Sequence, residues 1–90
     1  MKITHDETEE IRRQRTVAIN SAVQSHEKVS ERKRLESLYG QVWDTGQLSE
    51  DFDVLDFIAP YVVVRRRSDA RKGSLEFQHR PRFYFNFVVD

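Results

Sequence analysis

Residues 61–89, YVVVRRRSDARKGSLEFQHRPRFYFNFVV, decide the fold. Three runs rich in valine and phenylalanine alternate in this stretch with a polar turn and with the short connection Arg80-Pro81-Arg82. The runs are residues 61–67, 73–79 and 83–89. β-branched and aromatic residues favour strands, and short connections join antiparallel neighbours. We therefore expect an antiparallel β-meander of three strands, or of four if the β-prone residues 53–58 join it.

The alternation of side chains within the meander predicts its register. If Arg67 pairs with Ser74 and His79 with Phe83, the large apolar side chains gather on one face, and Arg65 lies opposite Glu76. That face carries Val62, Val64, Leu75, Phe77, Phe83, Phe85 and Phe87. Because a slip of one residue would turn the whole set outward, the pattern supports this register. We expect this face to be the core and the opposite face to be open.

The N-terminal half has the composition of a helix. Residues 1–39 contain no glycine or proline, and Thr4 with Glu7 has the spacing of a capping box. One apolar stripe follows the helical period, through Ile11, Ala18, Ala22 and Val29. We expect a single long helix within residues 6–43. Since residues 25–34 hold one apolar side chain, two helices broken near Ser25–Ser30 are the alternative.

A turn and a short helix connect the two halves. Asp44 or Thr45 is placed to cap a helical turn over Gln47–Asp51. With 90 residues, the chain has room for one domain, which we assign to residues 1–90. The expected class is α+β, with helix over 1–43, the turn and short helix over 44–52, and the antiparallel sheet over 53–89.

The composition excludes several classes of protein. The chain has no cysteine, which excludes disulfides, thiolate nucleophiles and cysteine-based zinc sites. No apolar run approaches the roughly 20 residues that a membrane helix needs. Residues 1–10 are polar and acidic, unlike a signal peptide. We therefore expect a cytoplasmic protein that does not enter a membrane.

No motif in the sequence predicts catalysis. The histidines, His5, His26 and His79, stand at no metal-ligand spacing, and the acidic residues 50–56 lack the ligand order of a calcium loop. Neither a serine-nucleophile motif nor a glycine-rich phosphate loop occurs. We predict no catalytic residue, no metal site and no cofactor, and hence a protein that is not an enzyme.

Charge is unevenly distributed along a chain whose net charge is zero. Residues 44–60 hold five acidic and no basic side chains, whereas residues 61–82 hold seven basic and two acidic ones. In the predicted register, tyrosines lie among these arginines on the open face. The candidate binding surface consists of Tyr61, Arg65, Arg67, Gln78, Arg80, Arg82 and Tyr84.

Two functions fit such a surface. Tyrosine and arginine are enriched in protein interfaces, so the first hypothesis is an accessory protein that binds a partner protein or a second copy of itself as a homodimer. Aromatic side chains flanked by arginine also stack nucleobases and neutralise phosphates, so the alternative is a nucleic-acid-binding module.

Overall fold

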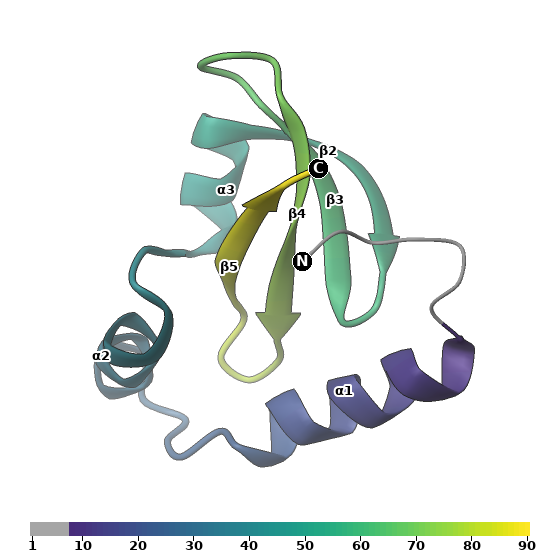
Figure 1. Cartoon of the computed structure of the whole chain (residues 1–90). Coiled ribbons are helices and arrows are strands. Elements are labelled where there is room, and N and C mark those ends of the chain that lie inside the picture. The colour runs from purple at the N-terminus through teal and green to yellow at the C-terminus, as the bar shows by residue number, and fades with distance from the viewer. Residues whose placement is uncertain (1–7) are drawn as a thin grey trace.

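Three helices and a five-stranded antiparallel sheet make up residues 8–90, the part of the chain that the computed structural model describes (Figure 1). The helices are α1 (Glu9–Ser21), α2 (Lys28–Tyr39) and α3 (Thr45–Asp51). The strands are β1 (Val42–Trp43), β2 (Phe52–Ile58), β3 (Tyr61–Arg66), β4 (Lys72–Gln78) and β5 (Phe83–Val89), in the order β1-β5-β4-β3-β2. The α+β class is confirmed, with one strand more than expected. The predicted capping box at Thr4 and Glu7 lies outside the described residues.

The N-terminal half forms two helices, so the single long helix is wrong and the alternative is confirmed. Thr8 caps α1, its Oγ1 accepting a hydrogen bond of 3.2 Å from the backbone N–H of Ile11. Between the helices, the backbone N–H of Gln24 donates to the buried carboxylate of Glu31 at 3.2 Å. In one continuous helix, Gln24 and Glu31 would lie about two turns apart, so this bond requires a break between α1 and α2. Helix α2 ends at Gly40, which adopts a φ of +81°.

Helix α3 begins with a complete capping box. Asp44 Oδ1 accepts a hydrogen bond of 2.7 Å from the backbone N–H of Gln47, and Gln47 Oε1 accepts one of 3.1 Å from the N–H of Asp44. The predicted short helix is therefore confirmed, with Asp44 rather than Thr45 as its cap. The residues before it, Val42 and Trp43, form strand β1 and not the end of a helix.

The pairing of β3 with β4 differs from the predicted register. Glu76 lies opposite Tyr61, four residues before its predicted partner Arg65, and Arg65 lies opposite Lys72. The hairpin is tighter than expected because the backbone N–H of Arg66 bonds the carbonyl of Arg71 at 2.8 Å. The observed register differs from the predicted one by four residues. Because this is an even number, Val62, Val64 and Leu75 remain on the same face.

A β-bulge divides strand β5 between the two faces of the sheet. Gly73 lies opposite Val89, as the predicted register requires, but the register shifts between Ser74 and Glu76, so that Phe77 faces Tyr84. Asn86 stands at this bulge with a φ of +59°. The prediction of a single phenylalanine face is therefore wrong. Phe83 and Phe85 lie on one face, and Phe77 and Phe87 on the other.

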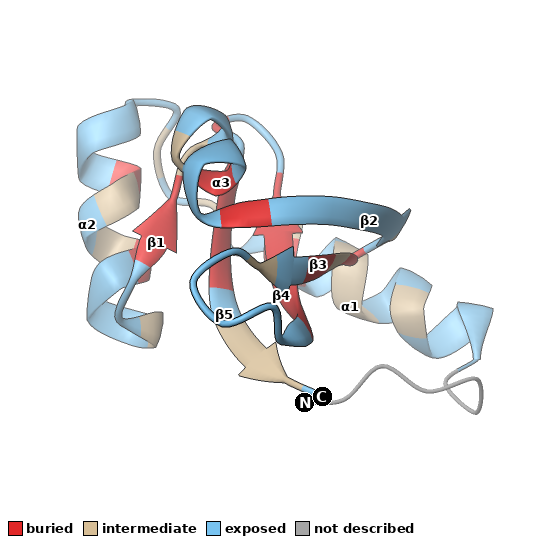
Figure 2. Cartoon of the chain, turned by 90° about the horizontal axis from the view of Figure 1, so that it is seen from above, coloured by how far each residue is buried: buried red, intermediate tan, exposed pale blue. Residues whose placement is uncertain are grey.

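Both faces of the sheet are consequently buried over most of β3 and β4 and the first part of β5, whereas β2 is mostly exposed (Figure 2). Helices α1 and α2 cover one face, whose core is Ile19, Leu35, Val42, Phe83 and Phe85, with Tyr39 against it. Helix α3 and the curved strand β2 border the other face, whose core is Trp43, Leu48, Phe52, Val62, Val64, Leu75, Phe77 and Tyr84, with Phe87 against it. The chain thus builds two cores rather than one core and an open face.

Two buried carboxylates tie the helices to the sheet. Glu76 accepts hydrogen bonds from Arg15 of α1 at 2.7 and 3.0 Å and from Asn86 at 3.1 Å. This ion pair holds the pKa of Arg15 above its usual value. Glu31 of α2 bonds Gln78 of β4 at 2.9 Å. A buried carboxylate is tolerated when donors surround it, so these contacts set where each helix docks.

Candidate functional site

The seven residues predicted as a binding surface do not share one surface. Tyr61, Gln78 and Tyr84 are buried, at 3%, 0% and 2% exposure. The four arginines are exposed but lie in two pairs at different connections. Arg65 and Arg67 stand at the β3–β4 hairpin, and Arg80 and Arg82 stand at the β4–β5 turn. The predicted open face does not exist, because the bulge and the helices leave Tyr61, Gln78 and Tyr84 buried within the fold.

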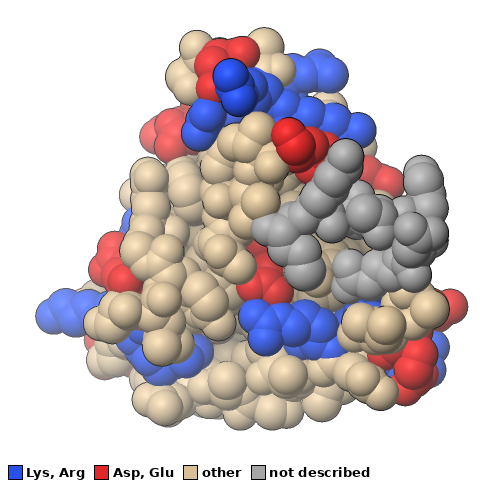
Figure 3. Space-filling model, in the orientation of Figure 1, with Lys and Arg blue, Asp and Glu red and all other residues tan. Residues whose placement is uncertain are grey.

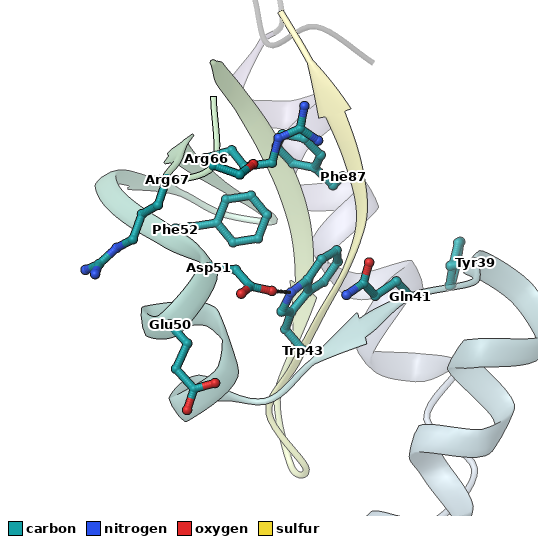
Figure 4. A pocket seen from close by; sticks show the side chains of 10 residues that line it. Tyr39, Gln41, Trp43, Glu50, Asp51, Phe52, Arg66, Arg67 and Phe87 are labelled. Carbon is teal, nitrogen blue, oxygen red and sulfur yellow. Dashed lines mark hydrogen bonds between the residues drawn. The ribbon is translucent and has the colours of Figure 1, made fainter. Parts of the chain in front are cut away.

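A cleft lies instead at the edge of the sheet, where β1 ends. Strand β1 pairs with Tyr84 and Phe85 alone, so beyond Phe85 no described strand borders the outer edge of β5, the edge that faces away from β4. Beside this gap is a cavity of about 550 Å³, which we call the Trp43 cleft (Figure 4). It is lined by Tyr39, Gln41, Trp43, Glu50, Asp51, Phe52, Arg66, Arg67, Ser68 and Phe87. This volume falls within the range of small-ligand sites.

Three aromatic rings form the floor of the Trp43 cleft. The rings of Trp43 and Phe52 meet edge to face with centroids 5.3 Å apart, and those of Phe52 and Phe87 lie 5.0 Å apart. The indole Nε1–H of Trp43 donates to Asp51 Oδ2 at 2.8 Å, which fixes the indole at the end of α3. Gly73 admits the ring of Phe87, because a Cβ at position 73 would lie 2.8 Å from it.

The arginines at the rim of the cleft are already paired. Arg66 donates two hydrogen bonds to Asp69, at 3.0 and 2.6 Å, and its guanidinium lies 5.1 Å from the centroid of the Phe87 ring. The hydrogen bonds from Arg66 lower the pKa of Asp69 to about 2. Arg67 pairs with Asp53 at 3.0 Å. Figure 3 shows the result at the β3–β4 hairpin, at the top of the view, where blue and red atoms lie side by side.

The acidic side of the rim is less engaged. Glu50 has an exposed side chain with no hydrogen bond or ion pair to any described residue, and Gln41 is in the same state. Asp51 accepts a hydrogen bond of 2.8 Å from Trp43 and forms no ion pair with a described residue. The charge at the cleft that has no opposite partner is therefore negative.

We compared the chain with known protein families, curated proteins and solved structures. None of the three comparisons gives a match.

Two kinds of feature are absent from the described residues. Within residues 8–90, no three histidine, aspartate or glutamate side chains come together as a metal site would require. The same residues include no helix that is long and apolar enough to cross a membrane.

Sequence reasoning missed the Trp43 cleft. Its three floor residues lie in β1, β2 and β5. Trp43 and Phe52 are separated by helix α3 alone, but Phe87 comes from the last strand of the chain. The available signal was the single tryptophan of the chain, next to the acidic segment 44–60. That signal does not reveal that β1 pairs with β5 and ends early.

Proposed function

We propose that this is a non-enzymatic binding protein that holds an extended segment of a partner protein in the Trp43 cleft, as a strand added to the outer edge of β5. The proposal rests on one observation: an edge of β5 that pairs with no described strand lies beside a preformed aromatic cleft. Strand addition supplies affinity through backbone hydrogen bonds, and adjacent pockets supply specificity through side chains.

The backbone of β5 offers bonds to such a segment. The N–H of Asp90 donates to the carbonyl of Lys72 at 3.0 Å, so Asp90 faces β4. Because consecutive residues of a strand alternate between its two neighbours, Val88 also faces β4, whereas Phe87 and Val89 direct their backbone groups outward. An added strand would bond these two residues.

The cleft favours a particular chemistry in the added segment. Its aromatic floor suits an apolar side chain, and the free charge of Glu50 and Asp51 suits a neighbouring lysine or arginine. Arg66 and Arg67 are committed to Asp69 and Asp53, so they offer little to an acidic partner. We therefore infer a segment that combines apolar and basic residues.

The opposite edge of the sheet is less suited to strand addition. Strand β2 has a bulge between Val54 and Asp56 and carries Asp53 and Asp56. Bulges and charges are the features by which proteins prevent edge pairing. The β5 edge also has a bulge, at Asn86, but it borders the cleft, and its residues 87–89 carry no charge.

A capped hexapeptide that alternates lysine with leucine or valine tests the proposal. Trp43 is the only tryptophan, so its fluorescence should change saturably as the peptide fills the cleft. In hydrogen exchange followed by NMR, the amides of Phe87 and Val89 should gain protection, and those of Val88 and Asp90 should not change. A peptide N-methylated at its edge-facing amides should bind about tenfold more weakly, since it loses roughly one net hydrogen bond.

Charge variants provide the matched comparison. Glu50→Gln should weaken binding by about two- to fivefold, the size of a surface ion pair. Glu10→Gln removes the same charge from exposed α1 and should leave binding unchanged. The proposal is overturned if no peptide of this type binds at millimolar concentration, or if binding leaves the Phe87 and Val89 amides unprotected.

A further inference from the structure

A second hollow lies beside the β4–β5 turn, and it shares no lining residue with the Trp43 cleft. It has a volume of about 840 Å³ and is bounded by the end of α1, the α1–α2 connection and the turn itself. We call it the turn hollow, and its lining is Asn20, Val23, His26, His79, Arg80 and Arg82. None of these side chains is a carboxylate, whereas four can carry positive charge.

The positive character extends beyond the turn hollow. Arg82 also borders a neighbouring hollow of about 560 Å³, which Lys28 and Arg32 line as well. Asp44 is the one carboxylate of that second lining, and its Oδ1 already accepts from Gln47. Arg32 is paired with Glu36 and Asp44, at 3.5 and 3.9 Å, whereas Lys28 has no ion pair with a described residue, so Lys28 adds positive charge beside Arg82.

Arg82 is held in place before any ligand arrives. Its Nη1 donates to the hydroxyl of Tyr84 at 3.1 Å, and its guanidinium lies 4.8 Å from the centroid of the Phe77 ring. Its Nη2 lies 3.1 Å from Nδ1 of His79. A guanidinium only donates, so this Nδ1 accepts, and the proton of the His79 ring is on Nε2.

The two histidine rings of the hollow differ in which nitrogen carries the proton. Burial, and then the charges of Arg82 and Arg80, lower the pKa of His79, so its ring is neutral near neutral pH with Nε2–H as donor. Nδ1 of His26 lies 3.2 Å from the carbonyl oxygen of Arg80, which only accepts, so this Nδ1 carries a proton. The Nε2 of His26 has no bond to a described residue.

The Arg80 side chain completes the set. It is exposed and makes no hydrogen bond or ion pair with any described residue. Arginine binds phosphate oxygens through several parallel N–H donors. We propose that the turn hollow binds a phosphate group, with Arg80 and Arg82 as its charged donors, the Nε2–H of His79 as a neighbouring donor, and His26 beside them in the lining. This site is separate from the strand-binding edge and does not depend on the function proposed above.

NMR with inorganic phosphate, titrated at constant ionic strength, is the direct test. The ring C2–H resonances of His26 and His79 should move saturably, whereas the amides of Ser68 and Asp69, at the β3–β4 hairpin, should not. Arg80→Gln should weaken phosphate binding about tenfold, as expected for one charge-assisted hydrogen bond. Arg65→Gln is the matched control, because Arg65 is also exposed without a described partner but stands at the other hairpin. It should change the affinity less than about twofold.

A ten-residue single-stranded oligodeoxythymidine then distinguishes the source of the phosphate. If it displaces inorganic phosphate and its affinity falls steeply with salt, the ligand is a nucleic-acid backbone. If inorganic phosphate binds and the oligonucleotide binds no more tightly, the ligand is a small phosphorylated molecule. The proposal is overturned if neither probe moves the His26 and His79 resonances, or if Arg65→Gln weakens binding as much as Arg80→Gln. Trp43 fluorescence, which reports the other site, should not respond to inorganic phosphate.

Discussion

Glu31→Gln should remove a large share of the stability at neutral pH. The Glu31 side chain is 0% exposed and accepts four hydrogen bonds. They come from the backbone N–H of Gln24 at 3.2 Å, from Arg34 at 3.0 and 2.6 Å, and from Gln78 at 2.9 Å. Burial on its own would raise the pKa of this carboxyl, but the bonds from Arg34 and Gln78 outweigh it and lower the pKa to about 2. A glutamine would place an NH₂ group against one of these donors.

The pKa sets the expected magnitude. The pKa of the Glu31 carboxyl falls from 4.5 in the unfolded chain to about 2 in the folded protein. At about 1.4 kcal/mol per pKa unit, ionisation of this carboxyl favours folding by about 3 kcal/mol. Because the folded pKa is the lower one, this stabilisation is complete above about pH 5 and is lost as the pH falls toward 2. The difference in unfolding free energy between wild type and Glu31→Gln should follow the same course.

Urea unfolding at a series of pH values measures this difference. We expect Glu31→Gln to lose about 3 kcal/mol at pH 7 and progressively less below pH 5. Glu27→Gln is the control, since Glu27 is exposed at the start of the same helix and its carboxylate bonds the hydroxyl of Ser30 at 2.8 Å. It should cost less than about 1 kcal/mol. A loss at Glu31 that is the same at pH 7 and pH 3 would refute the reasoning.

Two further substitutions test the packing of β5. Gly73→Ala should destabilise the protein by about 1–3 kcal/mol, because the new Cβ would lie 2.4 Å from the carbonyl oxygen of Val88. Gly46→Ala is the control, because its Cβ would lie 3.5 Å from Asp44 Oδ1, an ordinary contact, and thermal melts should show that it is tolerated. Phe85→Ala should cost about 3–5 kcal/mol, since Phe85 is 1% exposed, whereas Val54→Ala on β2, at 42% exposure, should cost under about 1 kcal/mol. Equal losses in denaturant titrations would contradict the burial of Phe85 beneath the helices.

The sequence by itself determined the α+β class and several local elements. The strands at Tyr61, Gly73 and Phe83 and the short helix capped by Asp44 follow from signals contained within a few residues. A capping box needs two side chains three positions apart, and a strand needs a run of β-prone residues. The turn composition then makes neighbouring strands antiparallel. Such signals do not depend on what the rest of the chain does, so they are legible from the sequence.

Only the tertiary structure decided the break between α1 and α2, the two cores and the Trp43 cleft. The break coincides with the contacts of Glu31 to Gln24, seven residues before it, and to Gln78, 47 residues after it, and the second of these forms only once the sheet is in place. At Asn86, one extra residue reverses which face each side chain of β5 occupies, and no composition signal marks it. The open face predicted for Tyr61 and Tyr84 disappears for this reason. The cleft exists because β1 stops after two residues, and strand length is set by which backbone groups find partners once the whole sheet has formed.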